Sequence, residues 1–267
     1  MTLDVWVGSH AFLRPLANLH AQLEAAVAAA APPEPALPEW RTYESEFDGG
    51  VPLLASTGAA IDLGAIDAAG DRAIEALNGH APDDPGLREC VAWMARSAAL
   101  RPVVDAFAAW RDDTRWMRPY CPLCGSAPAM AQLTGIEPGR LRHLVCGHCA
   151  TRWRYGRTTC PFCETESSRL SSLAAEGECG LRIDYCETCR AYLKTYNGQG
   201  HEAVLLADWT SLHLDLAACE RGWRRAAGSL YSFDTNDPAA PPAYRSDSDD
   251  SGLPATAGGL TRELLRD

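Results

Sequence analysis

Apolar residues recur at helical spacing in three stretches of the first 110 residues: 10–31, 58–79 and 84–110. In the first stretch Leu16, Leu19 and Leu23 fall on one stripe, and a pair of prolines follows it, which ends a helix. In the third, Pro102 is expected to kink or split the helix. A short helix is also expected near residues 40–47. These patterns predict an all-helical N-terminal domain over residues 1–117.

The helical pattern stops near residue 117, which places a domain boundary at about 115–119. Short β-like runs follow at residues 141–145, 151–155 and 191–196. Residues 203–220 again have a helical apolar face, which includes Trp209 and Cys219. Beyond residue 231 the chain is rich in Asp, Ser, Pro and Gly. We therefore expect an α+β protein with a small metal-binding domain over 118–196, a C-terminal helix within 197–230, and a disordered tail over 231–267.

The second region holds four C-x-x-C pairs, which contain eight of the chain's eleven cysteines. Two thiolates at this spacing on a tight turn can hold one metal ion, and two such pairs make a tetrahedral four-sulfur site. The sequence therefore predicts two metal sites. Their ligands are Cys121, Cys124, Cys146, Cys149, Cys160, Cys163, Cys186 and Cys189.

A unit of about forty residues occurs twice in this region. The gap between the first and second pair nearly equals the gap between the third and fourth, and Leu141-Arg142 and Leu181-Arg182 stand at the same distance before the closing pair. The repeat favours the first pair with the second at one site, and the third with the fourth at the other. The alternative joins the second pair to the third across ten residues. Both pairings remain open at this point.

Four thiolates suit Zn²⁺ or a single iron, and spacing alone does not separate the two metals. The C-P-x-C-G form of the first pair favours rubredoxin-like iron over zinc. A four-cysteine site has no open position for water or substrate, so metal-dependent hydrolysis is not expected. The sequence shows no phosphate loop, nucleophile elbow or paired-carboxylate pattern. We therefore expect no catalytic residue and no enzymatic activity.

Charge and composition narrow the choice of partners. The formal net charge of −11 over 267 residues argues against a general nucleic-acid or anionic-membrane binder. Residues 118–195 nevertheless hold ten basic against seven acidic residues. Arg152, Arg154 and Arg157 are either a solvated strand face or a patch that meets an acidic partner. Neither a membrane span nor a secretory signal is seen, so the expected location is the cytoplasm.

Other polar residues near the cysteines are weaker candidates. His143 and His148 are expected to be exposed or to lie around the sites without binding metal, because eight thiolates already complete both sites. Cys90 is expected to be a small buried residue of the third helix. Cys179 is interpreted as a bystander.

The cysteine region and the residues after it resemble the formate dehydrogenase accessory protein family, FdhE. The resemblance covers about 118–225 and is weak before that, where only residues 47–54 look similar. Beyond the cysteine pairs, the matching segments are Gly125–Pro128, Leu141–Val145, Ala150–Trp153, Tyr192–Lys194, Ala207-Asp208, Ser211-Leu212, Leu214–Leu216 and Gly222-Trp223. The sequence departs from the family at Trp209, where a second acidic residue is usual, and in the ending after Gly228.

The resemblance implies a helical N-terminal domain and two rubredoxin-like sites that hold iron. It also implies a cytoplasmic accessory or chaperone role in the maturation of a molybdenum- or tungsten-dependent formate dehydrogenase, through contact with its catalytic subunit. On this basis Asp208 in the last helix joins the three arginines as a candidate partner-binding residue.

Two other functions compete with this one. C-x-x-C pairs also occur in thiol and electron-transfer proteins, although a redox dithiol usually opens a helix in a βαβ pattern, and none is visible. A nucleic-acid-binding zinc ribbon fits the local excess of basic residues but not the overall charge. The sequence leaves a homodimer open.

Overall fold

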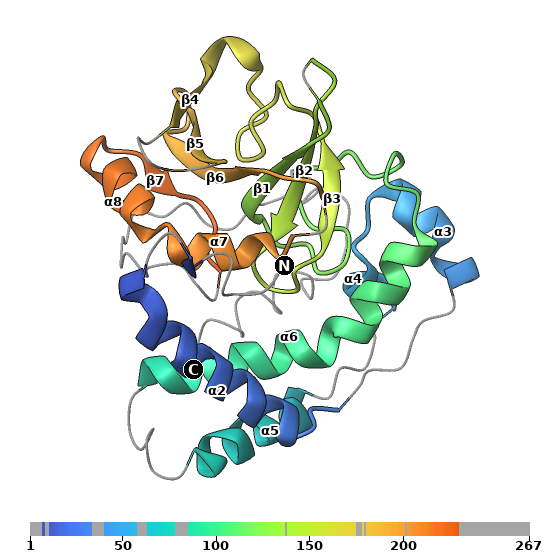
Figure 1. Ribbon diagram of the computed structural model, residues 1–267. Helices are drawn as coiled ribbons and strands as arrows, with labels where there is room; N and C mark the ends of the chain where they lie inside the picture. Colours follow the sequence, from blue (N-terminus) through green and yellow to red (C-terminus); the bar gives the residue numbers. More distant parts are fainter. Residues whose placement is uncertain are drawn as a thin grey trace.

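The structure is a computed structural model that describes residues 7–8, 11–33, 40–57, 63–77, 85–136, 138–174, 178, 180–200 and 202–229. The predicted disordered tail, the helix start at Asp84 and the thiol of Cys179 lie outside these residues. The described part has helices at both ends of the chain and a β-sheet between them (Figure 1). This is the expected α+β class. No helix in the described part is both long and apolar enough to cross a membrane.

The N-terminal helices follow the predicted ranges closely. A short 3₁₀ turn (Ala11–Leu13) leads into α2 (Arg14–Ala29), and α5 (Leu63–Ala76) and α6 (Pro85–Trp110) pack against α2. Leu23, Val27, Ile66 and Val91 form the core between these three helices. Pro102 does not split α6, which continues through it to Trp110. The described N-terminal residues also form α3 (Trp40–Gly49) and α4 (Leu53–Thr57).

Seven strands in the described residues form one sheet, and their order shows how the two sequence repeats are arranged. The strands are β1 (Pro128–Thr134), β2 (Leu141–Cys146), β3 (Arg152–Tyr155), β4 (Leu170–Ala174), β5 (Leu181–Cys186), β6 (Ala191–Asn197) and β7 (Arg224–Arg225). The order is β3-β2-β1-β6-β5-β4, with β7 paired to β6. Each repeat is thus an antiparallel three-stranded unit. The units join side by side in the same orientation, because β1 and β6 pair in parallel.

The two faces of the sheet bury different partners. On one face, Met130, Val145 and Ile183 pack under α7 (Val204–Thr210) and α8 (Leu212–Glu220), which lie beside the sheet in Figure 1. The other face joins the N-terminal helices in a single core. The residues of this core include Tyr43, Phe47, Phe107, Trp116, Leu144 and Trp153. Burial of this many aromatic side chains ties α3, α4 and α6 to the first repeat.

The predicted helix over residues 203–220 is two helices, because the backbone leaves the helical path at Ser211. Lys194 on β6 accounts for the break. Its ammonium group donates to the carbonyls of Asp208 (2.8 Å) and Ser211 (3.4 Å). The Ser211 hydroxyl donates to the carbonyl of Ala207 at 2.6 Å. Carbonyls near the break therefore have polar partners outside the regular helix ladder.

A buried charge network lies beneath this break. The Nζ atom of Lys194 is 2.6 Å from Asp208 and 2.7 Å from Asp215, and Arg225 contacts the same two carboxylates at 2.7 and 3.0 Å. The side chains of Lys194 and Asp208 are both 0% exposed. The hydroxyl of Tyr192 donates to Asp215 at 2.7 Å. Two cations and two anions thus connect β6, β7, α7 and α8 without unbalanced charge.

Replacement of Lys194 by methionine is expected to destabilise the protein by about 3–5 kcal/mol, because two buried carboxylates would lose one of their two cations. The measurement is urea unfolding followed by far-UV circular dichroism, with metal content determined in parallel. The control is Arg88→Met, which removes a cation from an exposed ion pair between α6 and α5. A loss no larger for Lys194→Met than for this control would contradict the structural role of the network.

Candidate metal centres

The four C-x-x-C pairs share one backbone conformation. The residue after the second cysteine has a positive φ in every case: +79° at Gly125, +59° at Ala150, +56° at Glu164 and +61° at Arg190. Each of these residues donates its backbone N–H to the carbonyl of the first cysteine, at 2.9 to 3.1 Å. Only the first pair places glycine there. The other three pairs therefore keep the same turn, although a residue with a side chain has a steric cost at positive φ.

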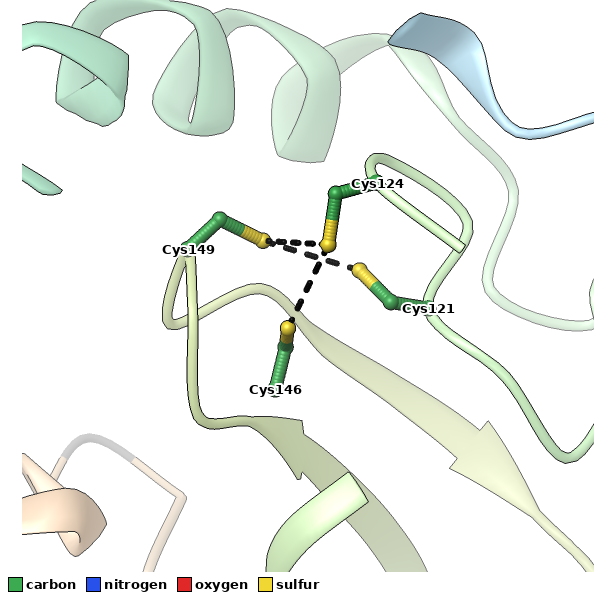
Figure 2. A group of neighbouring side chains, drawn as sticks. All are labelled: Cys121, Cys124, Cys146 and Cys149. Atoms are coloured by element: carbon green, nitrogen blue, oxygen red, sulfur yellow. Dashed lines mark hydrogen bonds between the residues drawn. The ribbon is translucent and has the colours of Figure 1, made fainter. Parts of the chain in front are cut away.

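The first site brings together the sulfurs of Cys121, Cys124, Cys146 and Cys149 (Figure 2). Its Sγ–Sγ distances are 3.6 Å for Cys121–Cys149, 3.5 Å for Cys124–Cys146 and 3.7 Å for Cys124–Cys149. Hydroxyl groups two residues past each pair lie near the sulfurs. Thr151 Oγ1 is 3.1 Å from Cys149 Sγ, and Ser126 Oγ is 3.4 Å from Cys124 Sγ. Such hydroxyls can donate to thiolate sulfur.

The second site brings together Cys160, Cys163, Cys186 and Cys189. Cys160 Sγ is 3.8 Å from Cys189 Sγ, and Cys163 Sγ is 3.7 Å from Cys186 Sγ. The backbone N–H of Phe162 donates to Cys160 Sγ at 3.4 Å. The first pair thus meets the second and the third meets the fourth, which is the grouping that the sequence repeat favours.

Both sulfur sets fit a tetrahedral metal ion. Metal–sulfur bonds of about 2.3 Å place the sulfurs of a regular tetrahedron about 3.8 Å apart. The close sulfur pairs lie 3.5 to 3.8 Å apart, and all four ligand atoms of each group lie within 4.8 Å of one another. Each group could therefore hold one metal ion. Iron and zinc both accept this donor set.

The thiols of each group influence one another's protonation. In the first site, hydrogen bonds from neighbouring thiols, Cys121 first, lower the pKa of Cys124, while burial raises the pKa of Cys146 and Cys149. In the second, a hydrogen bond from Cys160 is the main cause that lowers the pKa of Cys189 to about 5. In each group one cysteine is thus favoured as a thiolate without metal. A bound cation would favour deprotonation of the other three.

The two sites differ in what surrounds them. At the first site Cys121, Cys146 and Cys149 are buried. Helix α6 contacts the second cysteine turn of this site, because the Ser97 hydroxyl donates to the carbonyl of His148 at 3.1 Å. At the second site Cys163 is exposed and Cys189 is half-buried. Solvent and chelators therefore reach the second site more easily.

The residues near the sites take structural positions. His148 stacks on Trp93 with ring centroids 4.8 Å apart, and His143 is half-buried on β2. Neither belongs to a four-cysteine group. Cys90 is half-buried on α6, where burial raises its pKa. Cys219 was assigned to the apolar face of the last helix, and this is wrong: it is exposed, because the break at Ser211 changes the orientation of α8.

The candidate partner-binding residues do not form one surface. Asp208 is fully buried in the network with Lys194 and Arg225, so it is used inside the chain. Arg152 is half-buried and donates to Gln132 Oε1 at 2.6 Å and to the carbonyl of Gly200. Arg154 is half-buried and Arg157 is exposed, close to the second site. Trp209, which replaces the usual acidic residue, packs with Val7 and Ala17 near α2.

Comparison with known proteins agrees with this architecture. The family model described as "FdhE, central domain" matches residues 120–157, which include the first site. Protein FdhE homolog of Aquifex aeolicus is 32% identical over 140 residues, half of each chain. The homolog of Pseudomonas putida is 38% identical over 120 residues, which cover 41% of this chain and 37% of the relative. The aligned parts thus span half or less of the curated relatives.

A solved structure extends the comparison to nearly the whole fold. The crystal structure of the FdhE protein from Pseudomonas aeruginosa superposes with a TM-score of 0.59 at 24% identity, over 87% of this chain and 93% of that one. The resemblance to the FdhE family is confirmed. The FdhE-like fold includes the N-terminal helices, where the sequence resemblance was weak.

Replacement of Glu164 by glycine is expected to stabilise this FdhE-like chain by about 0.5–1 kcal/mol, because glycine adopts its positive φ without steric cost. Glu164→Ala is the matched control, since it removes the same side chain but keeps the Cβ atom. Thermal unfolding of the metal-loaded protein measures both. Equal midpoints for the two variants would show that the conformation carries no such cost.

Serine at Cys121 or at Cys186 is expected to lower the metal content of the purified protein from two ions to one. Because the first site also contacts the helices, Cys121→Ser is expected to lower thermal stability more than Cys186→Ser. Elemental analysis and thermal unfolding measure the two effects. Cys219→Ser, at an exposed thiol outside both groups, is the control. Retention of two ions by either site variant would refute the ligand assignment.

Proposed function

We propose that this protein is a cytoplasmic, non-enzymatic accessory factor for the maturation of a molybdenum- or tungsten-dependent formate dehydrogenase, and that it acts by binding the catalytic subunit. The observation that carries the proposal is the pair of closed four-sulfur groups, set in tandem on an FdhE-like fold. The role in maturation comes from the FdhE resemblance over the central region.

The geometry supports binding better than catalysis. Each group places four sulfurs around one position, so a bound ion has no vacant place for substrate or water. The eight cysteines would hold two ions, and we assign iron, as the resemblance implies. Iron in four sulfurs can change its charge by one electron, whereas zinc cannot. The chain's own part is to supply the thiolates and to surround them with hydroxyl and amide donors.

The two metal sites differ in their contacts with the core and with solvent. The first site lies against the N-terminal helices and supports the core. The second belongs to the other repeat and has an exposed ligand, Cys163. We infer that the first site has a mainly structural role and that the second lies closer to the partner.

The proposal predicts that the tagged protein, prepared without oxygen from its native host, retains a formate dehydrogenase catalytic subunit, which mass spectrometry would identify. Cys186→Ser is expected to lose this subunit, and Cys219→Ser is expected to keep it. Retention of nucleic acid in a salt-dependent manner, without the subunit, would instead support the zinc-ribbon alternative. A functional test is formate dehydrogenase activity in a host that lacks the gene and expresses each variant.

A further inference from the structure

The two repeats place equivalent residues on the same face of the sheet but cover them differently. Counted from the cysteines, Leu144 corresponds to Asp184, Trp153 to Leu193, and Leu123 to Phe162. In the first repeat all three residues are buried in the core that α3, α4 and α6 complete. In the second repeat Leu193 belongs to the same core and Phe162 packs against its border, so the repeats differ at the position of Asp184. An apolar position covered by helices in one repeat is therefore an aspartate in the other.

The cover of the first repeat includes backbone hydrogen bonds to its first cysteine turn. The N–H of Leu53 donates to the carbonyl of Pro122, and the N–H of Leu54 donates to the carbonyl of Leu123, both at 2.9 Å. The Leu53 side chain is fully buried in the same core. The short segment at the start of α4 thus binds this turn through two backbone N–H groups and packs one apolar side chain beside it.

The corresponding place on the second repeat is a half-open cavity of about 170 Å³. Its walls come from strands β1, β2, β4, β5 and β6 and from the chain around the third cysteine pair, and no described helix contributes to them. Within the described residues, the carbonyls of Pro161 and Phe162 accept no hydrogen bond, although they are the counterparts of those that Leu53 and Leu54 occupy.

The cavity is lined by more arginines than carboxylates. Arg142, Arg157 and Arg182 line it, against a single carboxylate, Asp184. Arg182 and the hydroxyl of Thr195 each donate to that carboxylate at 2.7 Å, so its oxygens are already occupied.

The described partners of Arg142 are neutral groups, among them the Tyr155 ring, whose centroid lies 5.2 Å from the guanidinium carbon. Arg142 is 5% exposed, and no carboxylate of the described residues lies within ion-pair distance. Its Nη2 atom donates to the carbonyls of Gly156 and Thr159, but its buried Nε atom has no partner in the described part of the chain. Burial lowers the pKa of this guanidinium. A carboxylate brought into the cavity would supply the missing charge.

We propose that this cavity is the docking site for an extended segment of the partner polypeptide that carries one acidic side chain. The segment takes the place on the second repeat that residues 53–54 take on the first. Its amides donate to the carbonyls of Pro161 and Phe162, and its carboxylate meets Arg142 and Arg182. A single carboxylate is specified because the thiolates of Cys160 and Cys186 also line the cavity and repel further negative charge.

This inference rests on the proposed function, since the partner is the formate dehydrogenase catalytic subunit. The test measures the affinity of the metal-loaded, full-length chain for that purified subunit. Arg182→Gln removes one cavity charge, and Ser172→Glu places a negative charge at the exposed rim on β4 without disturbing the arginines. The controls are Arg88→Gln on α6 and Leu216→Glu on α8, which make the same kinds of change at exposed positions away from the cavity.

Both cavity variants are expected to raise Kd by about tenfold or more, with Ser172→Glu the stronger, while both controls stay within about twofold of the wild type. All four variants should keep two metal ions and the wild-type unfolding midpoint. If the wild type binds the subunit and the cavity variants bind it equally well, the docking site is wrong and the proposed function stands. If the wild type does not bind the subunit, the proposed function fails, and the docking site fails with it.

Discussion

The convergence of paired cysteine turns is the constraint on which the rest of the structure depends. Each three-stranded repeat is too small to bury a core of its own, so cross-linking of two turns by a metal ion would supply folding energy that apolar burial does not. In all four turns the residue after the second cysteine has a left-handed backbone conformation, and in three of them this residue is not glycine. The geometry needed to bring four sulfurs together thus outweighs the local backbone preference of Ala150, Glu164 and Arg190.

The parallel pairing of β1 with β6 joins the two repeats into one sheet, and this gives the sheet two faces of different character. One face carries α7 and α8, which are held by the buried network around Lys194. The other carries the N-terminal helices, whose core covers the first repeat and reaches Leu193 and Phe162 of the second. The same supersecondary unit therefore serves once as the inner part of a core and once as a more open surface, and the difference lies in what packs against it.

The buried ion network shows how specificity is obtained at the C-terminal end. Two buried carboxylates paired with two buried cations add little net stability compared with apolar residues of similar size. They do restrict how the surrounding strands and helices can be arranged, because each charge needs its partner. Lys194 meets Asp208 and Asp215 on the two sides of the helix break at Ser211, and Arg225 joins them from β7, which pairs with β6. The resemblance placed Asp208 at a partner surface, whereas the fold uses it internally.

The sequence by itself determined the eight clustered cysteines, the repeat, the ranges of the longer N-terminal helices and of β2, β3 and β6, and the α+β class, because these depend on local spacing and periodicity. The tertiary structure decided the rest. Cysteine spacing left two pairings open, and only the closure of the sulfurs in space distinguishes them. The break at Ser211, the burial of Asp208 and the unequal cover of the repeats depend on contacts between residues distant in sequence, such as Leu53 with Pro122, which no local pattern encodes.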